Sequence, residues 1–148
     1  MDAWSELRRA SSAIFITAVL ALAASALAAM PVGGARFSGK TSERLAVTLR
    51  VSGDGRYVAR MHIRYRVACS DGATGAPTTN LFDLRLDRHG RFRFDGTYTG
   101  RVDKSKNRVR MHGTVSRRRA TGTFSLKAKR KKVRCHSARV RWHARLAS

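Results

Sequence analysis

Acidic side chains are scarce in this chain, which narrows the chemistry that it can support. Only nine of the 148 residues are Asp or Glu, against 31 Lys or Arg. After the first thirty residues, one glutamate (Glu43) and six aspartates are left, whereas glycoside hydrolysis usually needs two carboxyl groups flanking a bond. Asp83 and Asp95 fall on predicted strands among arginines, where we expect solvated ion pairs rather than an acid and a base. The remaining aspartates fall in predicted turns, where the carboxylate hydrogen-bonds local backbone: Asp54, Asp71, Asp87 and Asp103.

Signatures of nucleophilic, redox and metal chemistry are also absent from the sequence. No Gly-x-Ser-x-Gly motif occurs, and the two cysteines lack the CxxC spacing of a redox or zinc site. His62 and His112 fall on the outward parity of different predicted strands, without a third ligand, so we interpret them as solvated surface histidines. The sequence therefore predicts no catalytic residue, no metal site and no cofactor.

Alternation of apolar and polar residues runs through most of the chain after residue 44, and helical periodicity is missing there. A period of two places successive side chains on opposite faces of a β-strand. Gly53-Asp54-Gly55 predicts a tight turn between two such runs. Residues 35–148 are therefore predicted to form one all-β domain, an antiparallel β-sandwich or barrel of seven to eight strands. The expected strands include 45–51, 57–69, 82–86, 92–102, 109–115, 120–126 and 140–146.

Residues 57–69 show the alternation most clearly. Every odd position from Tyr57 to Cys69 is apolar, and arginines fill most of the even positions. The pattern predicts a strand whose buried face includes Cys69 and whose outer face carries arginines. Gly96, Gly113 and Gly122 lie on the apolar parity of their own strands, which predicts a bend or a close backbone approach at each.

Residues 1–29 have the three-part layout of a secretory signal peptide. Arg8 and Arg9 precede an apolar run that ends in the small residues Ala26 and Ala28. An uncleaved membrane anchor is the alternative, but a run of about 17 residues is at the lower limit for spanning a bilayer. We expect a cleaved signal helix, a linker at residues 30–34, and a mature domain that is secreted or associated with the cell envelope.

Export would place the two cysteines in an oxidising compartment, where disulfides form. Cys69 and Cys135 are the only cysteines of the chain, so we predict that they pair. Two free buried thiols are the alternative. In the chain-entropy model, a bridge that closes a loop of this length stabilises the fold by about 4 kcal/mol.

Positive charge is the strongest functional signal in the sequence. The net charge is +22, and the loss of residues 1–29 leaves it unchanged because two basic and two acidic residues leave together. So basic a domain gathers anions, and the planar fork of arginine matches phosphate or carboxylate oxygens. A genome-driven excess of arginine at solvated positions is the alternative. The residues that we expect to bind a polyanion are Arg56, Arg60, Arg64, Arg66, Lys127, Lys129, Arg130, Lys131, Lys132, Arg134, Arg139 and Arg141.

The expected partners follow from charge and export. They are an anionic cell-wall polymer or an anionic lipid surface, with extracellular nucleic acid as a further polyanion. No predicted helix is available to enter a DNA major groove, so sequence-specific DNA recognition is not expected. We hypothesise a non-enzymatic domain that binds an anionic polymer of the cell envelope. A structural or protein-interaction module without a polyanion ligand is the alternative, and an enzyme would need a pocket with converging polar groups.

Five short motifs are spread over nearly all of the chain after the signal segment: Phe37–Thr41, Cys69–Gly72, Phe94–Tyr98, Ala120–Phe124 and Cys135–Ser137. Together these motifs make the chain resemble small exported all-β proteins of actinobacteria, for which no activity is assigned. Because the motifs are structural, the resemblance implies the fold and export, and it carries over no active site.

Overall fold

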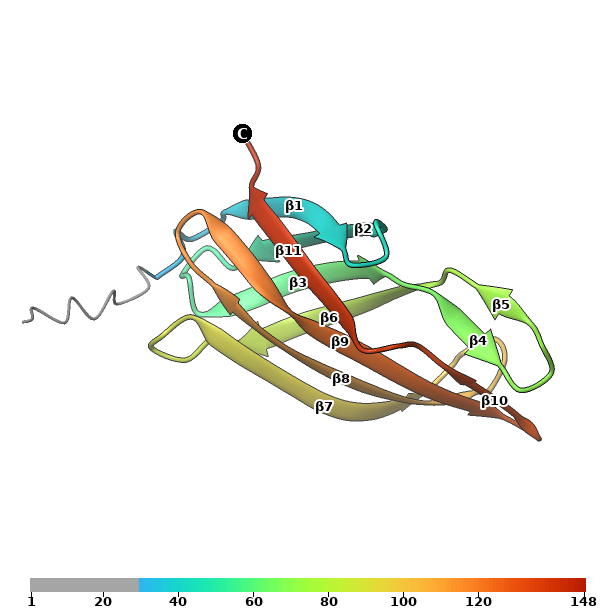
Figure 1. The fold of residues 1–148 in the computed structure, drawn as a ribbon. Coiled ribbons are helices and arrows are strands. Elements are labelled where there is room, and N and C mark those ends of the chain that lie inside the picture. Colours follow the sequence, from blue (N-terminus) through green and yellow to red (C-terminus); the bar gives the residue numbers. More distant parts are fainter. Residues whose placement is uncertain (1–29) are drawn as a thin grey trace, which may run out of the picture.

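Residues 30–148 form an antiparallel sheet of eleven strands that curls into a half-barrel (Figure 1). These are the residues that our computed structural model describes, and the predicted signal segment, residues 1–29, lies outside them. The all-β prediction is confirmed. The predicted count of seven to eight strands is wrong because β1 and three short strands carry too few alternating residues to stand apart from their neighbours. The strands are β1 (Arg36–Thr41), β2 (Ala46–Val51), β3 (Tyr57–Arg64), β4 (Val67–Cys69), β5 (Thr74–Gly75), β6 (Thr78–Arg85), β7 (Arg91–Thr99), β8 (Lys106–Val115), β9 (Arg119–Arg130), β10 (Val133–His136) and β11 (Val140–Leu146).

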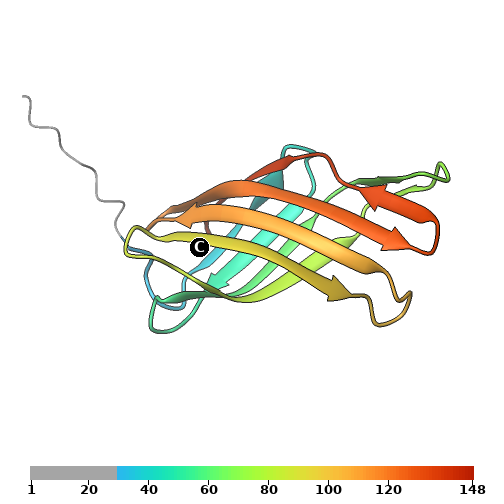
Figure 2. The same ribbon diagram turned by 90° about the horizontal axis from the view of Figure 1, so that it is seen from below.

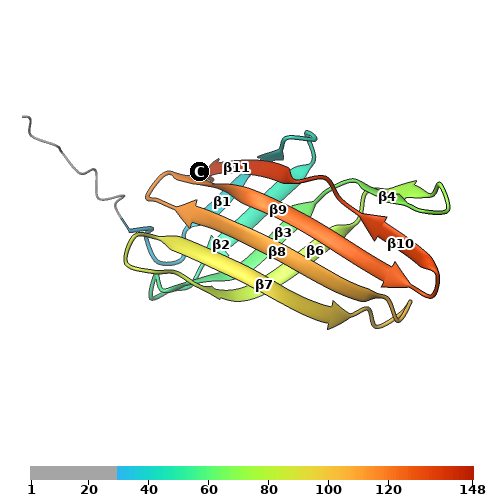
Figure 3. The same ribbon diagram turned by 60° about the horizontal axis from the view of Figure 1, so that its bottom comes forward.

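Eight of the strands follow one another around the curled sheet, in the order β6, β3, β2, β1, β11, β9, β8 and β7. The pairing of β1 with β11 makes the first and last described strands neighbours. Strands β6 and β7 are consecutive in the sequence, but no ladder joins them, so they are the two edges at which the half-barrel stays open. Figures 2 and 3 show the resulting layers, with β7, β8 and β9 on one side and β1, β2, β3 and β6 on the other.

The hydrophobic core lies between these two layers. Its largest fully buried side chains come from strands of both layers. Burial of one such side chain stabilises the fold by about 1.5–3 kcal/mol, so the core is the main force that holds the sheet in its curled form. Five of these side chains are Phe37, Met61, Ile63, Met111 and Phe124.

The segment before β1 packs against the turn between β2 and β3. The predicted linker, residues 30–34, turns at Gly33 and Gly34, and the Gly34 N–H donates to the Ser52 carbonyl at 3.0 Å. Pro31 is buried. This segment therefore belongs to the packed part of the domain.

Strand β3 departs from strict alternation at its start. The pattern predicts Ala59 inside, but Val58 is the fully buried residue there. The pairing with β2 slips between Val58 and Arg60, so that Ala59 is the extra residue of a β-bulge. A bulge shifts the side-chain parity by one position. Further along β3, the predicted inward positions from Met61 to Tyr65 are confirmed.

The same change of parity occurs on β6. The alternation predicts Phe82 inside together with Leu84, but Leu81 and Leu84 are the buried residues and Phe82 is 54% exposed. Asp83 lies between them with a φ of 53°, a backbone conformation that interrupts the regular strand. The guanidinium of Arg60 lies over the Phe82 ring, 5.6 Å from its centroid, and partly covers it.

Two glycines make room for a buried tryptophan. Gly113 and Gly122 lie opposite each other on β8 and β9. A Cβ atom on Gly113 would lie 2.7 Å from Cζ2 of Trp142, and one on Gly122 would lie 2.6 Å from the same atom. The Trp142 indole therefore packs directly on the two backbones, which confirms the predicted close approach at these glycines.

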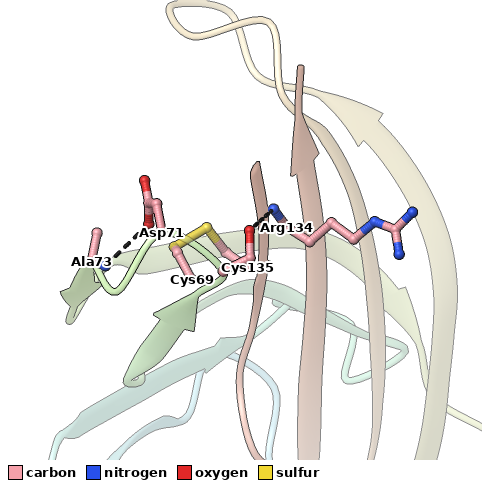
Figure 4. The surroundings of a disulfide bond; sticks show 6 residues. Cys69, Asp71, Ala73, Arg134 and Cys135 are labelled. Atoms are coloured by element: carbon pink, nitrogen blue, oxygen red, sulfur yellow. Dashed lines mark hydrogen bonds between the residues drawn. A yellow bond between two sulfur atoms is a disulfide. The ribbon is translucent and has the colours of Figure 1, made fainter. Parts of the chain in front are cut away.

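Cys69 and Cys135 form the predicted disulfide. The two residues lie directly opposite each other in the ladder between β4 and β10, at the end of the half-barrel away from the β8–β9 turn. Figure 4 shows the bond between the two strands, with the Arg134 side chain pointing away from it. The bridge therefore fastens the short strands β4 and β10 to each other at this end of the half-barrel.

We expect Gly122→Ala to lower the free energy of unfolding by about 1–3 kcal/mol, because an added methyl group overpacks the site under Trp142. Gly53→Ala is the matched control, since an added Cβ there meets nothing within 4 Å. Urea unfolding monitored by tryptophan fluorescence measures both. Equal stability of the two variants would contradict the packing described for Trp142.

Replacement of both cysteines, Cys69→Ala with Cys135→Ala, should lower the free energy of unfolding by about 2–4 kcal/mol. Without the bridge, the unfolded chain regains the conformational entropy that closing the loop had removed. The measurement is urea unfolding with and without a reductant. Reductant should destabilise the natural chain by a similar amount and leave the double variant unchanged. A natural chain that is indifferent to reductant would count against a stabilising bridge.

Candidate anion-binding surface

Strands β8 and β9 present basic side chains outward because the alternate positions are buried in the core. On β8, Val109 and Met111 point inward, while Arg108 and its neighbours of the same parity are exposed. On β9, Phe124 and Leu126 are buried, and the lysines that follow lie on the exposed parity. The outer face of these strands is therefore basic along the half that leads to the disulfide.

Strand pairing brings these basic residues together in two rows, each of which crosses β8, β9 and β10. Residues directly opposite on antiparallel strands have Cβ atoms about 4.5–5.5 Å apart, so each row is continuous. The first row is Arg108, Lys127 and His136, and the second is Lys106, Lys129 and Arg134.

These six side chains line a surface groove of about 890 Å³, and we call them the basic groove. Thr97 and Thr99 of β7 contribute hydroxyl groups to the same lining. No Asp or Glu of residues 30–148 takes part in it. The groove is therefore a concave surface that offers cationic and hydroxyl donors and has no carboxylate in its own lining.

Asp95 on β7 pairs with Arg108 of the groove and with the neighbouring Arg110. Its carboxylate accepts hydrogen bonds from Nε of Arg108 at 3.1 Å and from Nη2 at 3.3 Å. Nε of Arg110 lies 3.3 Å from Oδ2 of Asp95, the oxygen that also accepts from Nη2 of Arg108. The hydrogen bond from Arg108 is the main cause that lowers the pKa of Asp95, with the positive charges of both arginines adding to it. The expected outward ion pair at Asp95 is confirmed.

Like charges lie directly opposite each other throughout the basic groove. Lys106 faces Lys129, and Lys129 also faces Arg134 on its other side. Such cross-strand pairs destabilise a sheet, although water and salt weaken the repulsion between exposed groups. A bound anion would replace this repulsion by attraction and would therefore stabilise the sheet at this surface.

The structure brings together only part of the predicted cluster between β9 and β10. Arg130 lies apart from the groove, where its positive charge lowers the pKa of Asp103 after the larger effect of the Ser105 hydrogen bonds. Lys131 and Lys132 form the β9–β10 turn. The predicted residues that do line the groove are Lys127, Lys129 and Arg134.

The other predicted residues lie elsewhere. Arg139 is in the connection between β10 and β11, and Arg141 is exposed on β11 next to Thr123 of β9. The structure does not place either side chain in the basic groove. The predicted arginines of the β3 region are Arg56 in the turn before the strand, Arg60 and Arg64 on its outer face, and Arg66 just after it.

The arginines of β3 and the basic groove belong to opposite layers. Because both layers turn their apolar sides toward the shared core, their outer faces point in opposite directions (Figure 3). Arg60 instead continues a row with Arg50 of β2 and Arg36 of β1. The domain therefore has two separate basic faces, and the two predicted sets do not form one surface.

Sequence reasoning did not place three members of the basic groove in this cluster: Lys106, Arg108 and His136. The parity of β8 already marks Arg108 as outward. Only the register between β8 and β9 places it beside Lys127, and β10 was not separable from its surroundings by alternation. The missing signal was therefore the pairing of the strands rather than the direction of the side chains.

The two histidines considered for a metal site each bond a neighbouring strand. Nδ1 of His62 lies within hydrogen-bond distance of Oδ1 of Asn80, and Nε2 of His112 lies 2.7 Å from Oγ1 of Thr123. Since β3 and β8 are in opposite layers, these histidines do not face each other. Within residues 30–148, no group of three or more His, Cys, Asp or Glu side chains is arranged to hold a metal ion.

Comparison of the chain with protein-family models, with curated proteins and with solved structures finds no match. In the part of the chain that the structure describes, no helix is long and apolar enough to cross a membrane. The interpretation of the basic groove therefore rests on its geometry and charge.

Asp95→Asn should lower stability slightly at neutral pH, because exposed ion pairs contribute little but not nothing. Since the folded-state pKa of Asp95 lies below its ordinary 3.8, its ion pairs stabilise the fold above that pH and are lost as pH falls through the lowered pKa. Thermal unfolding between neutral pH and about pH 2 should therefore show a smaller acid-induced loss in the variant than in the natural chain. Identical acid profiles would contradict the ion pairs described for Asp95.

Proposed function

We propose that this domain binds an anionic polymer without catalysing a reaction, and that the basic groove is its principal contact surface. The observation that carries the proposal is the convergence of six basic side chains from three paired strands on one concave surface. Arginine forks match phosphate or carboxylate oxygens, and the lysines supply mobile point charges. A chain with regularly repeated negative charges is the ligand that such a surface fits.

The shape of the groove favours a polymer over a lipid surface. A concave surface accommodates a chain, whereas a flat bilayer contacts protruding residues first. Lys106, Lys127 and Lys129 are exposed on β-strands of the groove, and the large exposed apolar side chains that could insert into lipid lie elsewhere or at its edge. Tyr98, at that edge, is 43% exposed. Binding to an anionic vesicle is therefore the weaker expectation.

The cell envelope or its exterior is the place where we propose that binding occurs. Residues 1–29, with their signal-like pattern, support export, and the Cys69–Cys135 disulfide is the kind of bond that forms in an oxidising compartment. The similarity to exported actinobacterial proteins points in the same direction and stays a hypothesis. An anionic polymer of the envelope is then the partner of matching charge.

The roles of the aspartates support binding rather than catalysis. The Asp87 carboxylate accepts hydrogen bonds from the backbone N–H groups of His89 at 2.8 Å and Arg91 at 2.9 Å. Asp54 and Asp71 likewise bond the backbone of their own turns. These carboxylates hold turns in place, so we do not assign them to acid–base chemistry.

Lys127→Gln with Lys129→Gln should weaken binding to immobilised inorganic polyphosphate and flatten its salt dependence. Loss of two phosphate contacts reduces the slope of log affinity against log salt by about 1.5. The matched control is Arg117→Gln with Arg118→Gln, which removes the same charge from the β8–β9 turn at the far end of the hairpin. The measurement is the dissociation constant over a series of salt concentrations.

The outcomes of this experiment distinguish polymer binding at the groove from the alternative functions. Equal effects of the two double variants would contradict a specific role of the groove. Binding to polyphosphate that is unchanged at high salt would contradict electrostatic attachment, and absence of binding at any salt concentration would favour the protein-interaction module. Retention on anionic vesicles, but not on polyphosphate, would replace the polymer by a lipid surface.

A further inference from the structure

A cavity of about 480 Å³ opens at the end of the half-barrel that carries the disulfide. It lies on the inner side of the sheet, behind the basic groove on the outer face, and Tyr98, Asn107, Ala128 and Cys135 line both. Its volume falls within the range of about 300–1,000 Å³ that small-molecule sites usually have. Six of its lining residues, from β6, β7, β8, β9, β10 and the segment after β3, are Tyr65, Thr79, Tyr98, Asn107, Leu126 and Val133.

The cavity exists because the inward side chains become smaller and more polar toward this end. On β8 the buried residues change from Met111 and Val109 to Asn107. On β9 the large Phe124 and Leu126 are followed by Ala128 at the next inward position. The core therefore fills the other end of the half-barrel and stops short of this one.

Three of the five buried polar side chains in residues 30–148 line this cavity: Thr79, Ser105 and Asn107 are 4%, 6% and 7% exposed. The hydroxyl groups of Tyr65 and Thr79 lie 2.8 Å apart and satisfy each other. Burial raises the pKa of Tyr65 to about 12, so its hydroxyl stays neutral at physiological pH. Burial of polar groups costs free energy unless they find hydrogen-bond partners. The end of the half-barrel at the cavity is therefore less apolar than the rest of the interior and offers hydrogen-bonding groups to a bound molecule.

Asn107 offers the cavity an acceptor without a partner. Both of its side-chain hydrogen bonds use the amide nitrogen, which donates to the Ser105 carbonyl at 3.2 Å and to the Ser105 hydroxyl at 2.9 Å. Its carbonyl oxygen accepts no hydrogen bond from the described residues. Within residues 30–148 the one buried side-chain nitrogen or oxygen without a partner is Nε1 of Trp142, so Oδ1 of Asn107 is accessible from the cavity and is available to a donor on a bound molecule.

The charges around the cavity distinguish it from the basic groove. No lysine lines it, and its one arginine, Arg130, is accompanied by Asp71 and Asp103. The interior surface beyond this rim consists of apolar and neutral polar groups, including Tyr65, Leu126 and others. An anion would find no cationic partner inside, whereas a neutral molecule would lose no charge–water contacts on entry.

We propose that this cavity binds one neutral, mainly apolar small molecule that donates a hydrogen bond to Oδ1 of Asn107. Its apolar body packs against Tyr65, Leu126 and Val133, and the exposed ring of Tyr98 flanks the entrance at the open edge of β7. None of the lysines and arginines of the basic groove lines this cavity, so the proposal does not rest on the proposed function.

The probe for this proposal is N-phenyl-1-naphthylamine, a neutral apolar fluorophore with one N–H donor. Its fluorescence should rise saturably with the intact protein, at one probe per chain. Asn107→Leu keeps the side-chain size and should weaken binding about two- to tenfold through loss of one hydrogen bond. Ala128→Phe should abolish binding by filling the cavity. Val133→Phe, a half-buried position at the rim, is a second blocking variant if Ala128→Phe does not fold.

The control is Lys127→Gln with Lys129→Gln, which should bind the probe with the affinity of the natural chain at low and at high salt. Absence of saturable binding to the natural chain would overturn the proposal. So would full binding by a folded variant with either phenylalanine. Neither result would affect polyphosphate binding, so failure here is distinguishable from failure of the proposed function.

Discussion

The arrangement of strands around β9 is the constraint on which the rest of the structure depends. One edge of this twelve-residue strand is paired with β8, and the other edge is shared between β11 and β10. Ser137 joins the two shared parts: its N–H donates to the Leu126 carbonyl at 3.0 Å, and its hydroxyl accepts from the Leu126 N–H at 2.9 Å. The ladder on this edge therefore continues where the partner strand changes.

The change of partner divides β9 into two parts with different environments. Where β9 pairs with β11, Phe124 and the Trp142 site close the core between the two layers. Where it pairs with β10, the inner side opens into the cavity around Asn107 and the outer side carries the basic groove. The part of the sheet with the least apolar packing is thus the part that carries both proposed binding surfaces, and the Cys69–Cys135 bridge joins β4 to β10 there.

The alternation in the sequence was sufficient to predict the all-β fold class and most of the inward residues, whereas the disulfide was predicted from the presence of only two cysteines and the expected export. The alternation failed where the backbone itself departs from a regular strand. The bulge at Ala59 and the positive φ of Asp83 shift the parity on β3 and β6, which is why Val58 is buried and Phe82 is exposed. An alanine does not by itself predict a bulge, and an aspartate does not by itself predict a positive φ. The pairing with neighbouring strands determines the backbone conformation at both positions. The short strands β4, β5 and β10 are likewise set by their partners rather than by a pattern of their own.

The candidate site was also only partly predictable, because the sequence indicates which side chains point outward but not which strands pair. Lys127 and Lys129 follow from composition and parity, but their neighbours Lys106 and Arg108 depend on the register between β8 and β9. The arginines of β3 show the opposite case. They are basic and point outward like the lysines of β9, but they lie on the layer opposite the groove. Charge pattern indicates which side chains are solvated, and only the curl of the sheet shows which of them act together.

Amide chemical shifts in a titration with inorganic polyphosphate at low salt provide the most direct test of the central claim. If the basic groove binds the polymer, the largest shifts will cluster on β8, β9 and β10, around Lys106, Arg108, Lys127, Lys129 and Arg134, and those of β3 will be small. Shifts that spread evenly over the basic residues of both faces, or that centre on Arg60 and Arg64, would contradict it.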